Sequence, residues 1–205
     1  MLLRINPLNP RPTDIHYIAE QLRQGAVIIY PTDTVYGIGC AINQPKAIER
    51  VAKIKNINVE KANFTFIFSD LSHLSDYTKP INNTIFKLLK KSFPGAFTFI
   101  LEANNSIPKL FHNNKKTIGI RIPDNKILLE IVKELGLPLI NASVHDDDDE
   151  IAEYFSDPQD ILQKFGKQVD IVIDGGYGNL IPSTVIDCTE DEIKIVRQGL
   201  GEIEI

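Results

Sequence analysis

Apolar residues follow helical spacing in several parts of the chain. Near the start, four of them recur every three or four residues and so share one helix face: Ile15, Ile18, Ala19 and Leu22. Thr13 is suited to cap the start of this helix, and Gly25 is suited to end it. The same spacing predicts further helices at 45–54, 71–77, 84–91, 126–135 and 158–165.

Short continuous apolar runs, rich in β-branched and aromatic residues, lie between these helices. They predict strands at 26–30, 64–68, 97–101, 117–122, 137–142, 169–174, 184–187 and 193–197. Pro31 ends the first strand, and we expect the segment 31–39 to be a loop beyond it. The chain has no internal repeat and no long linker, so we predict one α/β domain over residues 1–205 with a mixed sheet.

Composition narrows the class of protein. Of the 205 residues, 43% are hydrophobic and 24% are charged, which is typical of a globular domain and excludes a disordered or collagen-like chain. No apolar run is long enough to span a bilayer, and residues 1–7 lack a signal-peptide pattern, so no membrane partner is expected. Two lone cysteines, Cys40 and Cys188, fit a reducing compartment. We therefore expect a cytoplasmic protein.

The net charge of −5 comes from one short run. The chain has 22 basic and 27 acidic residues, and five of the acids stand together at 146–150, so the rest carries 22 of each sign. Basic residues outnumber acidic ones by five to two in 46–61 and by eight to two in 87–126. Such segments form either an anion-binding face or an ordinary solvated surface, and the charge count leaves both open.

Four segments carry candidate chemistry. The first, 31–39, places hydroxyl groups and glycines beyond a strand end, which suits either a ligand site or a structural turn, and its glycine spacing fits neither phosphate-loop motif. The second, 53–61, holds lysines after a helix, which could neutralise phosphate or interact with the helix dipole. The fourth joins 182–187 to Arg197, whose guanidinium suits a bidentate phosphate contact.

The third segment contains Ser143 and His145 before the acidic run. A hydrolase is disfavoured because nothing orients the histidine or supplies an oxyanion hole. The run itself suits either a hydrated divalent cation or an extended solvated loop, and it lacks calcium-loop spacing. The scattered Cys and His residues show no zinc spacing, so we expect no structural metal site.

Together these segments resemble the YrdC-type family, the threonylcarbamoyl-AMP synthases of tRNA modification, and within it the YciO-like branch. The resemblance covers about residues 13–201, with the motifs in the family order: 31–39, 50–61, Pro94-Gly95 with Thr98, 117–121, Ser143, and 182–187 followed by Arg197-Gln198-Gly199. Likeness to the YciO-like branch rests on 63–65, 116–123 and 174–177. The resemblance implies a YrdC/RibB-like fold, with α/β and α+β character, in which helices flank a twisted, partly open mixed sheet with a large concave cavity.

The resemblance also implies a reaction and its partners. Family members join L-threonine, bicarbonate and ATP into threonylcarbamoyladenylate, usually with Mg²⁺, and the product modifies adenosine 37 of tRNA (t6A) with the help of other pathway proteins. By motif position, Thr34, Arg121, Ser143 and Ser183 would bind threonine. The ATP-binding residues would be Lys55, Lys61, Thr117, His145 and Arg197. Lys55, Arg121 and Ser143 would be the catalytic set.

Two family motifs are incomplete in this chain. The Lys-x-Arg motif falls on 55–57, where Ile57 replaces the arginine, and the Ser-x-Asn motif falls on 143–145, where His145 replaces the asparagine. An isoleucine cannot bind a phosphate, so the synthase reaction is expected to be weakened. We favour a nucleotidyltransferase of the synthase type. The alternative is a module that binds double-stranded RNA, tRNA or the ribosome and keeps the fold without the reaction.

Overall fold

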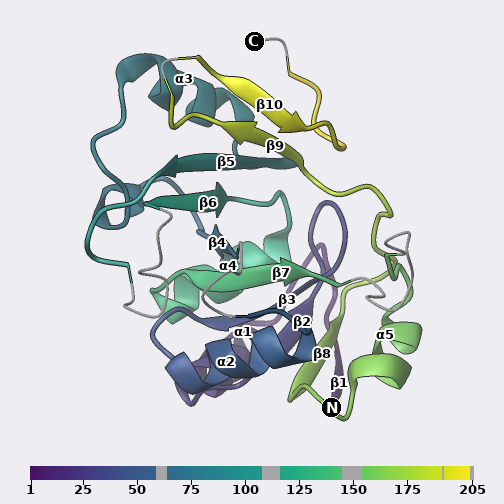
Figure 1. Ribbon diagram of the computed structural model, residues 1–205. Helices are drawn as coiled ribbons and strands as arrows, with labels where there is room; N and C mark the ends of the chain where they lie inside the picture. Colours follow the sequence, from purple (N-terminus) through teal and green to yellow (C-terminus); the bar gives the residue numbers. More distant parts are fainter. Residues whose placement is uncertain (59–63, 108–115, 145–153, 191, 204–205) are drawn as a thin grey trace.

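The computed structural model describes residues 1–58, 64–107, 116–144, 154–190 and 192–203. In these ranges the chain forms one ten-stranded mixed sheet and five α-helices (Figure 1). The helices are α1 (Pro12–Arg23), α2 (Pro45–Ile54), α3 (Asn83–Ser92), α4 (Lys126–Leu135) and α5 (Pro158–Phe165). The first five strands are β1 (Leu2–Arg4), β2 (Ile28–Tyr30), β3 (Gly37–Ala41), β4 (Thr65–Ile67) and β5 (Phe97–Glu102). The remaining five are β6 (Thr117–Arg121), β7 (Leu139–Ser143), β8 (Ile171–Asp174), β9 (Thr184–Asp187) and β10 (Lys194–Arg197).

The strand order, β1-β8-β2-β3-β7-β4-β6-β5-β9-β10, confirms the predicted mixed sheet. The pairs β1–β8, β2–β8, β4–β6 and β5–β9 are parallel, and the other neighbours are antiparallel. The four parallel pairs join segments far apart in sequence. The N-terminal strand β1 therefore lies at one end of the sheet beside β8, and β9 and β10 lie at the other end. The chain is one mixed α/β domain.

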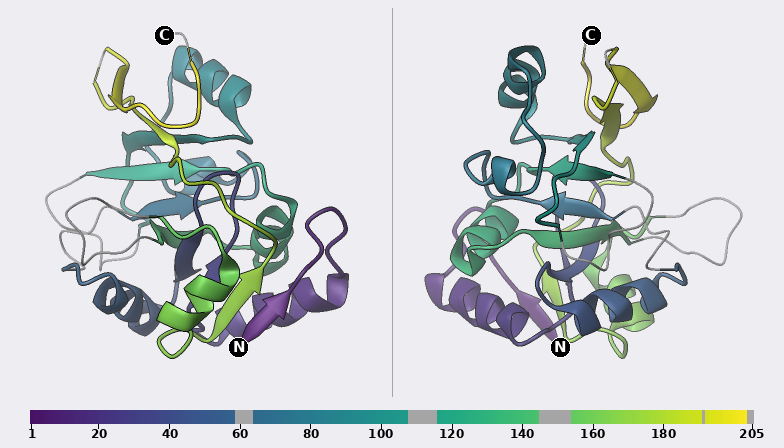
Figure 2. Two further views of the ribbon diagram at one scale, coloured as in Figure 1. Left: turned by 90° about the vertical axis from the view of Figure 1, so that its right-hand side faces the viewer. Right: turned by 60° about the vertical axis from the view of Figure 1, so that its left-hand side comes forward.

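Helices cover both faces of the sheet. α1 and α4 pack on one face over β2, β7 and β8, where their apolar residues form one core cluster. α2, α3 and α5 contribute to a larger cluster on the opposite face. In the right-hand view of Figure 2, α1 and α4 lie on one side of the strands and α2 on the other. The first face is thus covered by helices mainly over one half of the sheet.

Some helix boundaries differ from those predicted. α1 begins at Pro12, and Arg11 takes the N-cap position without a side-chain cap, so the prediction of Thr13 as N-cap is wrong. Proline is well suited to the first helical position because its missing N–H would have no partner there. The helix predicted at 71–77 reduces to one 3₁₀ turn, Leu74–Asp76.

Two strands were not predicted. β1 is only three residues long and pairs with β8, about 170 positions away, so no local pattern marks it. β3 contains Gly37 and Gly39, and because glycines are typical of turns, the segment 31–39 was expected to be a loop. A Cβ at Gly39 would overlap the backbone carbonyl of Ile140 and lie 2.9 Å from the Tyr30 hydroxyl. The glycine is therefore needed for the close approach of β3 to its neighbours.

Candidate active site

Strand pairing brings polar and small residues together on the helix-poor part of one sheet face. A central row crosses five strands through the directly paired residues Gly39, Asn141, Thr65, Gly119 and Ile100. Because side chains alternate along a strand, residues two positions away point to the same face. The face therefore also carries Ser143 and Thr117 beyond one side of the row.

Arg121 and Thr98 lie beyond the other side of the central row. Arg121 and Thr117 are four residues apart on β6, so their Cα atoms are separated by about 13 Å at 3.3 Å per residue. Ser143 is paired with Gly37 at the end of β7. The structure thus places these predicted residues in two groups, one on each side of the central row.

Arg121 is the centre of the first group. Its Nη2 donates to Thr34 Oγ1 at 2.6 Å and to Thr32 Oγ1 at 3.3 Å, and it also pairs with Asp33 Oδ1. Thr32 Oγ1 in turn accepts the Thr34 N–H at 3.0 Å and donates to the Val35 carbonyl at 2.7 Å, which holds the loop in shape. The predicted pair of Thr34 and Arg121 therefore makes direct contact.

The Arg121 guanidinium is poorly hydrated and incompletely bonded. The residue is 4% exposed, and burial lowers its pKa, while the neighbouring Asp33 carboxylate opposes that effect. Its Nε is buried and has no hydrogen-bond partner among the described residues. An unsatisfied buried donor costs about 1–3 kcal/mol, more for a charged group, so a binding partner supplied by a ligand would stabilise this site.

Ser183 and Arg197 form the neighbouring contact. The Ser183 and Thr98 hydroxyls lie 2.8 Å apart, and Arg197 donates from Nη2 to the Ser183 carbonyl at 2.8 Å and from Nε at 3.2 Å. Arg197 lies on β10, where all four residues are exposed. Burial is the main cause that lowers the pKa of Arg121, and the positive charge of Arg197 acts in the same direction.

The lysines and the predicted histidine are placed differently. Lys55 follows the last turn of α2, which packs on the opposite sheet face, and Lys55 is 5% exposed. Its position therefore gives no direct support for grouping it with Arg121. Lys61, His145 and the acidic run at 146–150 lie outside the described residues.

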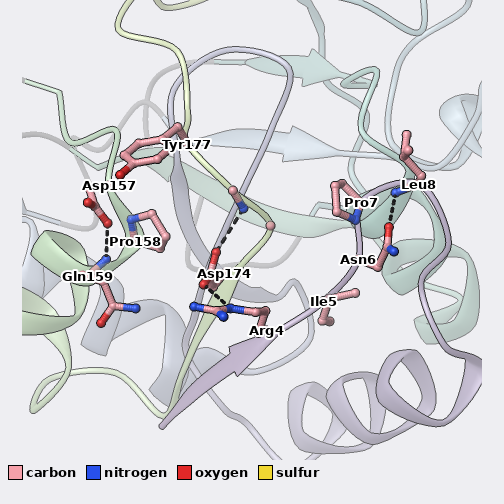
Figure 3. Close-up of a pocket in the computed structure, with 12 residues that line it drawn as sticks. Arg4, Ile5, Asn6, Pro7, Leu8, Asp157, Pro158, Gln159, Asp174 and Tyr177 are labelled. Atoms are coloured by element: carbon pink, nitrogen blue, oxygen red, sulfur yellow. Dashed lines mark hydrogen bonds and ion pairs between the residues drawn. The ribbon is translucent and has the colours of Figure 1, made fainter.

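A separate cavity of about 700 Å³ lies at the ends of β1 and β8. It is lined by three segments, 4–8, 157–159 and 174–177, and by none of the predicted site residues. Figure 3 shows Tyr177 on one side and Leu8 on the other, with the ion pair of Arg4 and Asp174 between them. This cavity is therefore distinct from the expected threonine and ATP site.

The segment 174–179 contributes residues 174–177 to the lining of this cavity and also bonds to the loop that carries Thr34. The Tyr36 hydroxyl donates to the Gly176 carbonyl at 2.6 Å, and the Asn179 N–H donates to the Thr34 carbonyl at 2.9 Å. A side chain at Gly178 would overlap the Tyr36 ring. This tight packing helps to fix the loop that carries Thr34.

Sequence reasoning did not assign a role to Asp33, Thr32 or Thr98. All three lie in segments that the motifs had already marked, 31–39 and the strand at 97–101. The sequence did carry one signal for Asp33: it is an acidic residue between two threonines, shortly after a predicted strand. Its partner, Arg121, is 88 positions away, so the sequence alone did not reveal the ion pair.

Of the described part of the chain, no helix is long and apolar enough to cross a membrane. In the same described residues, no three His, Cys, Asp or Glu side chains lie together in a position to hold a metal ion.

Comparisons with known proteins agree with the fold. The Sua5_yciO_yrdC family model, described as "Telomere recombination", matches residues 20–199. "Uncharacterized protein YciO" of Escherichia coli strain K12 is 40% identical over 201 residues, which cover 98% of this chain and 96% of that protein. A "Threonylcarbamoyl-AMP synthase" of Halorhodospira halophila is 25% identical over 88% of this chain and 92% of its own length.

Solved structures give the same result. The crystal structure of E. coli YciO has a TM-score of 0.90 at 39% identity and covers 98% of this chain and 97% of that one. P. abyssi Sua5 complexed with L-threonine has a TM-score of 0.88 at 22% identity, covering 97% of this chain and 57% of that one, a likeness of fold. The chain belongs to the Sua5/YciO/YrdC family.

Proposed function

We propose that the protein is an ATP-dependent synthase that joins L-threonine and bicarbonate to AMP, forming threonylcarbamoyladenylate for the t6A modification of tRNA. The observation that carries this proposal is the buried Arg121 guanidinium, which contacts Thr34 and keeps an unpartnered Nε at one end of a polar sheet face. A buried cation with an unused donor suits a carboxylate ligand. The family's synthases and the threonine-bound Sua5 support the choice of substrate.

The two residue groups would divide the substrates between them. Arg121, Thr34 and Ser183 would bind the carboxylate and hydroxyl of threonine. Thr117, about 13 Å from Arg121 along β6, would bind ATP. The family resemblance assigns Ser143 to threonine, but Ser143 lies on the Thr117 side of the central row, so we assign it to the ATP end of the face. Gly119, which lies between Arg121 and Thr117 on β6, would leave room for a ligand that extends from one group to the other.

Positive charge would stabilise the reacting phosphates. Arg197 lies beside the Arg121 group, and Lys55, Lys61 and His145 complete the proposed ATP contacts. Bound Mg²⁺ would screen the triphosphate charges. The carbamate formed by the amine of threonine and bicarbonate attacks the α-phosphate and expels pyrophosphate, so the protein must orient both substrates and exclude water. ATP as substrate fits a cytoplasmic location.

The experiment is a single incubation with labelled L-threonine, bicarbonate, ATP and Mg²⁺. We expect threonylcarbamoyladenylate and pyrophosphate from the wild-type protein, and at least a 100-fold loss in Arg121→Ala, because one charged contact in the transition state is worth about that much. Arg11→Ala is the matched control, since Arg11 is exposed, pairs with Asp14 at the start of α1 and has no hydrogen bond or ion pair to the Arg121 group among the described residues. If wild type gives no more product than Arg121→Ala, the proposal is wrong.

A second candidate function is binding of tRNA or double-stranded RNA. Three lysines of α3 are exposed on one short helix: Lys87, Lys90 and Lys91. Binding through phosphates would weaken steeply as salt rises, because counterions are released on association. A fluorescence titration with duplex RNA at two salt concentrations tests this function. RNA binding through α3 requires that the triple Lys→Gln variant bind duplex RNA more weakly than the wild-type protein.

A further inference from the structure

The ion pair of Arg121 and Asp33 is almost fully removed from water. The Arg121 side chain is 5% exposed and that of Asp33 is 13% exposed. Such a pair is close to neutral as a unit, so it attracts a singly charged ligand much less than a lone guanidinium would. A ligand that matches this ion pair should therefore also be close to neutral as a whole.

Both partners keep polar atoms that make no hydrogen bond within the described residues. Every hydrogen bond of the guanidinium comes from Nη2, so Nη1 and Nε have no partner among the residues that the structure describes. Asp33 uses Oδ1 for this contact, and within the same residues Oδ2 accepts no hydrogen bond. The ion pair therefore keeps both donors and an acceptor for a ligand.

The loop holds the carboxylate beside the guanidinium. Thr32 and Thr34 flank Asp33 and both bond to Arg121, while the Thr32 hydroxyl also ties the loop to the Val35 carbonyl at 2.7 Å. Packing of Tyr36 against segment 174–178 fixes the far end of the loop. Asp33 thus stays near Arg121 instead of turning out to solvent.

We propose that Asp33 selects ligands that carry an ammonium group beside their carboxylate, an inference that rests on the proposed amino-acid substrate. The ligand carboxylate accepts from the unused donors of Arg121, and its ammonium donates to Asp33 Oδ2. A zwitterion matches the neutral pair charge for charge. A carboxylate without the ammonium places an uncompensated negative charge beside Asp33 in a site with little water.

The test compares two ligands that differ in the amine alone. L-threonine and (R)-3-hydroxybutyrate share the carboxylate, the hydroxyl and the methyl group. We expect calorimetric titration of the wild-type protein to show threonine binding at least 10-fold more tightly, since a hydrogen bond to a charged group contributes about 1.5–3 kcal/mol. In Asp33→Asn this ratio falls towards one, because hydroxybutyrate gains and threonine loses. In Asp33→Glu, which keeps the charge, most of the preference returns.

The outcomes separate three explanations. If Asp33→Asn weakens both ligands equally, Asp33 only positions Arg121 and the proposal is wrong, although the proposed synthase stands. If wild type binds both ligands equally, the selectivity does not exist. If wild type binds neither, the proposed function fails together with this inference. Should Asp33→Asn not fold, the wild-type and Asp33→Glu ratios decide. The proposal requires a wild-type ratio of at least 10-fold and an Asp33→Glu ratio that keeps most of it, and it is wrong if either fails.

Discussion

Two glycines on the same sheet face are expected to respond in opposite ways to an added methyl group. Gly39 and Gly119 both lie in the central row, in β3 and β6, and neither has a positive φ angle. A Cβ at Gly39 would overlap the Ile140 carbonyl, which belongs to the backbone and cannot turn aside. A Cβ at Gly119 would meet Thr65 Oγ1 at 3.4 Å and the Thr98 methyl at 3.5 Å, which are ordinary contacts.

The magnitudes follow from these contacts. Gly39→Ala overpacks a buried strand pair and should lower the free energy of unfolding by about 2–3 kcal/mol or more. For a chain of this size that corresponds to a fall in Tm of roughly 4–12 °C. Gly119→Ala should change the free energy of unfolding by less than about 1 kcal/mol, because the reduced entropy of the unfolded chain offsets small adjustments.

Function should follow the opposite order. The methyl group of Gly119→Ala stands on the polar face between Arg121 and Thr117, where the proposed ligand crosses the sheet. We expect this variant to fold normally and to bind ATP and threonine together at least 10-fold more weakly. Each separate substrate, held at one end of the face, should lose less affinity.

Urea denaturation and calorimetric titration of the two variants test this reasoning. Gly119→Ala with wild-type stability and wild-type binding would show that the ligand does not cross the central row. Gly39→Ala with wild-type stability would show that β3 and β7 are not held as closely as the structure indicates. Either result refutes the corresponding step.

Three further changes have defined outcomes. Arg121→Ala should lower the free energy of unfolding by about 2–4 kcal/mol, because it leaves the nearly buried Asp33 carboxylate without its cation. In a double-mutant cycle measured by urea denaturation, adding Asp33→Ala should recover part of this lost stability. Tyr36→Phe should cost about 1 kcal/mol and speed hydrogen exchange in 174–178, because it removes a 2.6 Å bond. Burial raises the pKa of Cys40 to about 12 and that of Cys188 to about 11, so at pH 8 about one thiol in a thousand or fewer is ionised. Alkylation of both thiols with iodoacetamide should therefore require unfolding, and rapid labelling of the native protein would contradict this reasoning.

Local patterns were sufficient for most helices and strands. The helix spacing at 126–135 matches α4, since apolar residues at that spacing have to face a core and Asn125 caps the start. The runs at 97–101 and 184–187 match β5 and β9 closely. Predictions failed where a tertiary contact decides: at 71–77 the apolar spacing did not form an α-helix, and β3 depends on glycines that admit a neighbouring strand.

For the candidate site, the sequence determined the chemical groups and the structure determined which of them meet. The motifs identified Thr34, Arg121 and Ser183, because hydroxyls and a guanidinium suit a polar ligand. Sequence order alone cannot show that Arg121 pairs with Asp33, which is 88 positions away, or that Arg197 donates to the Ser183 carbonyl. These contacts arise because β6 and β9 lie beside β5 while the loop after β2 folds back over the same face, and such proximity is a property of the sheet as a whole.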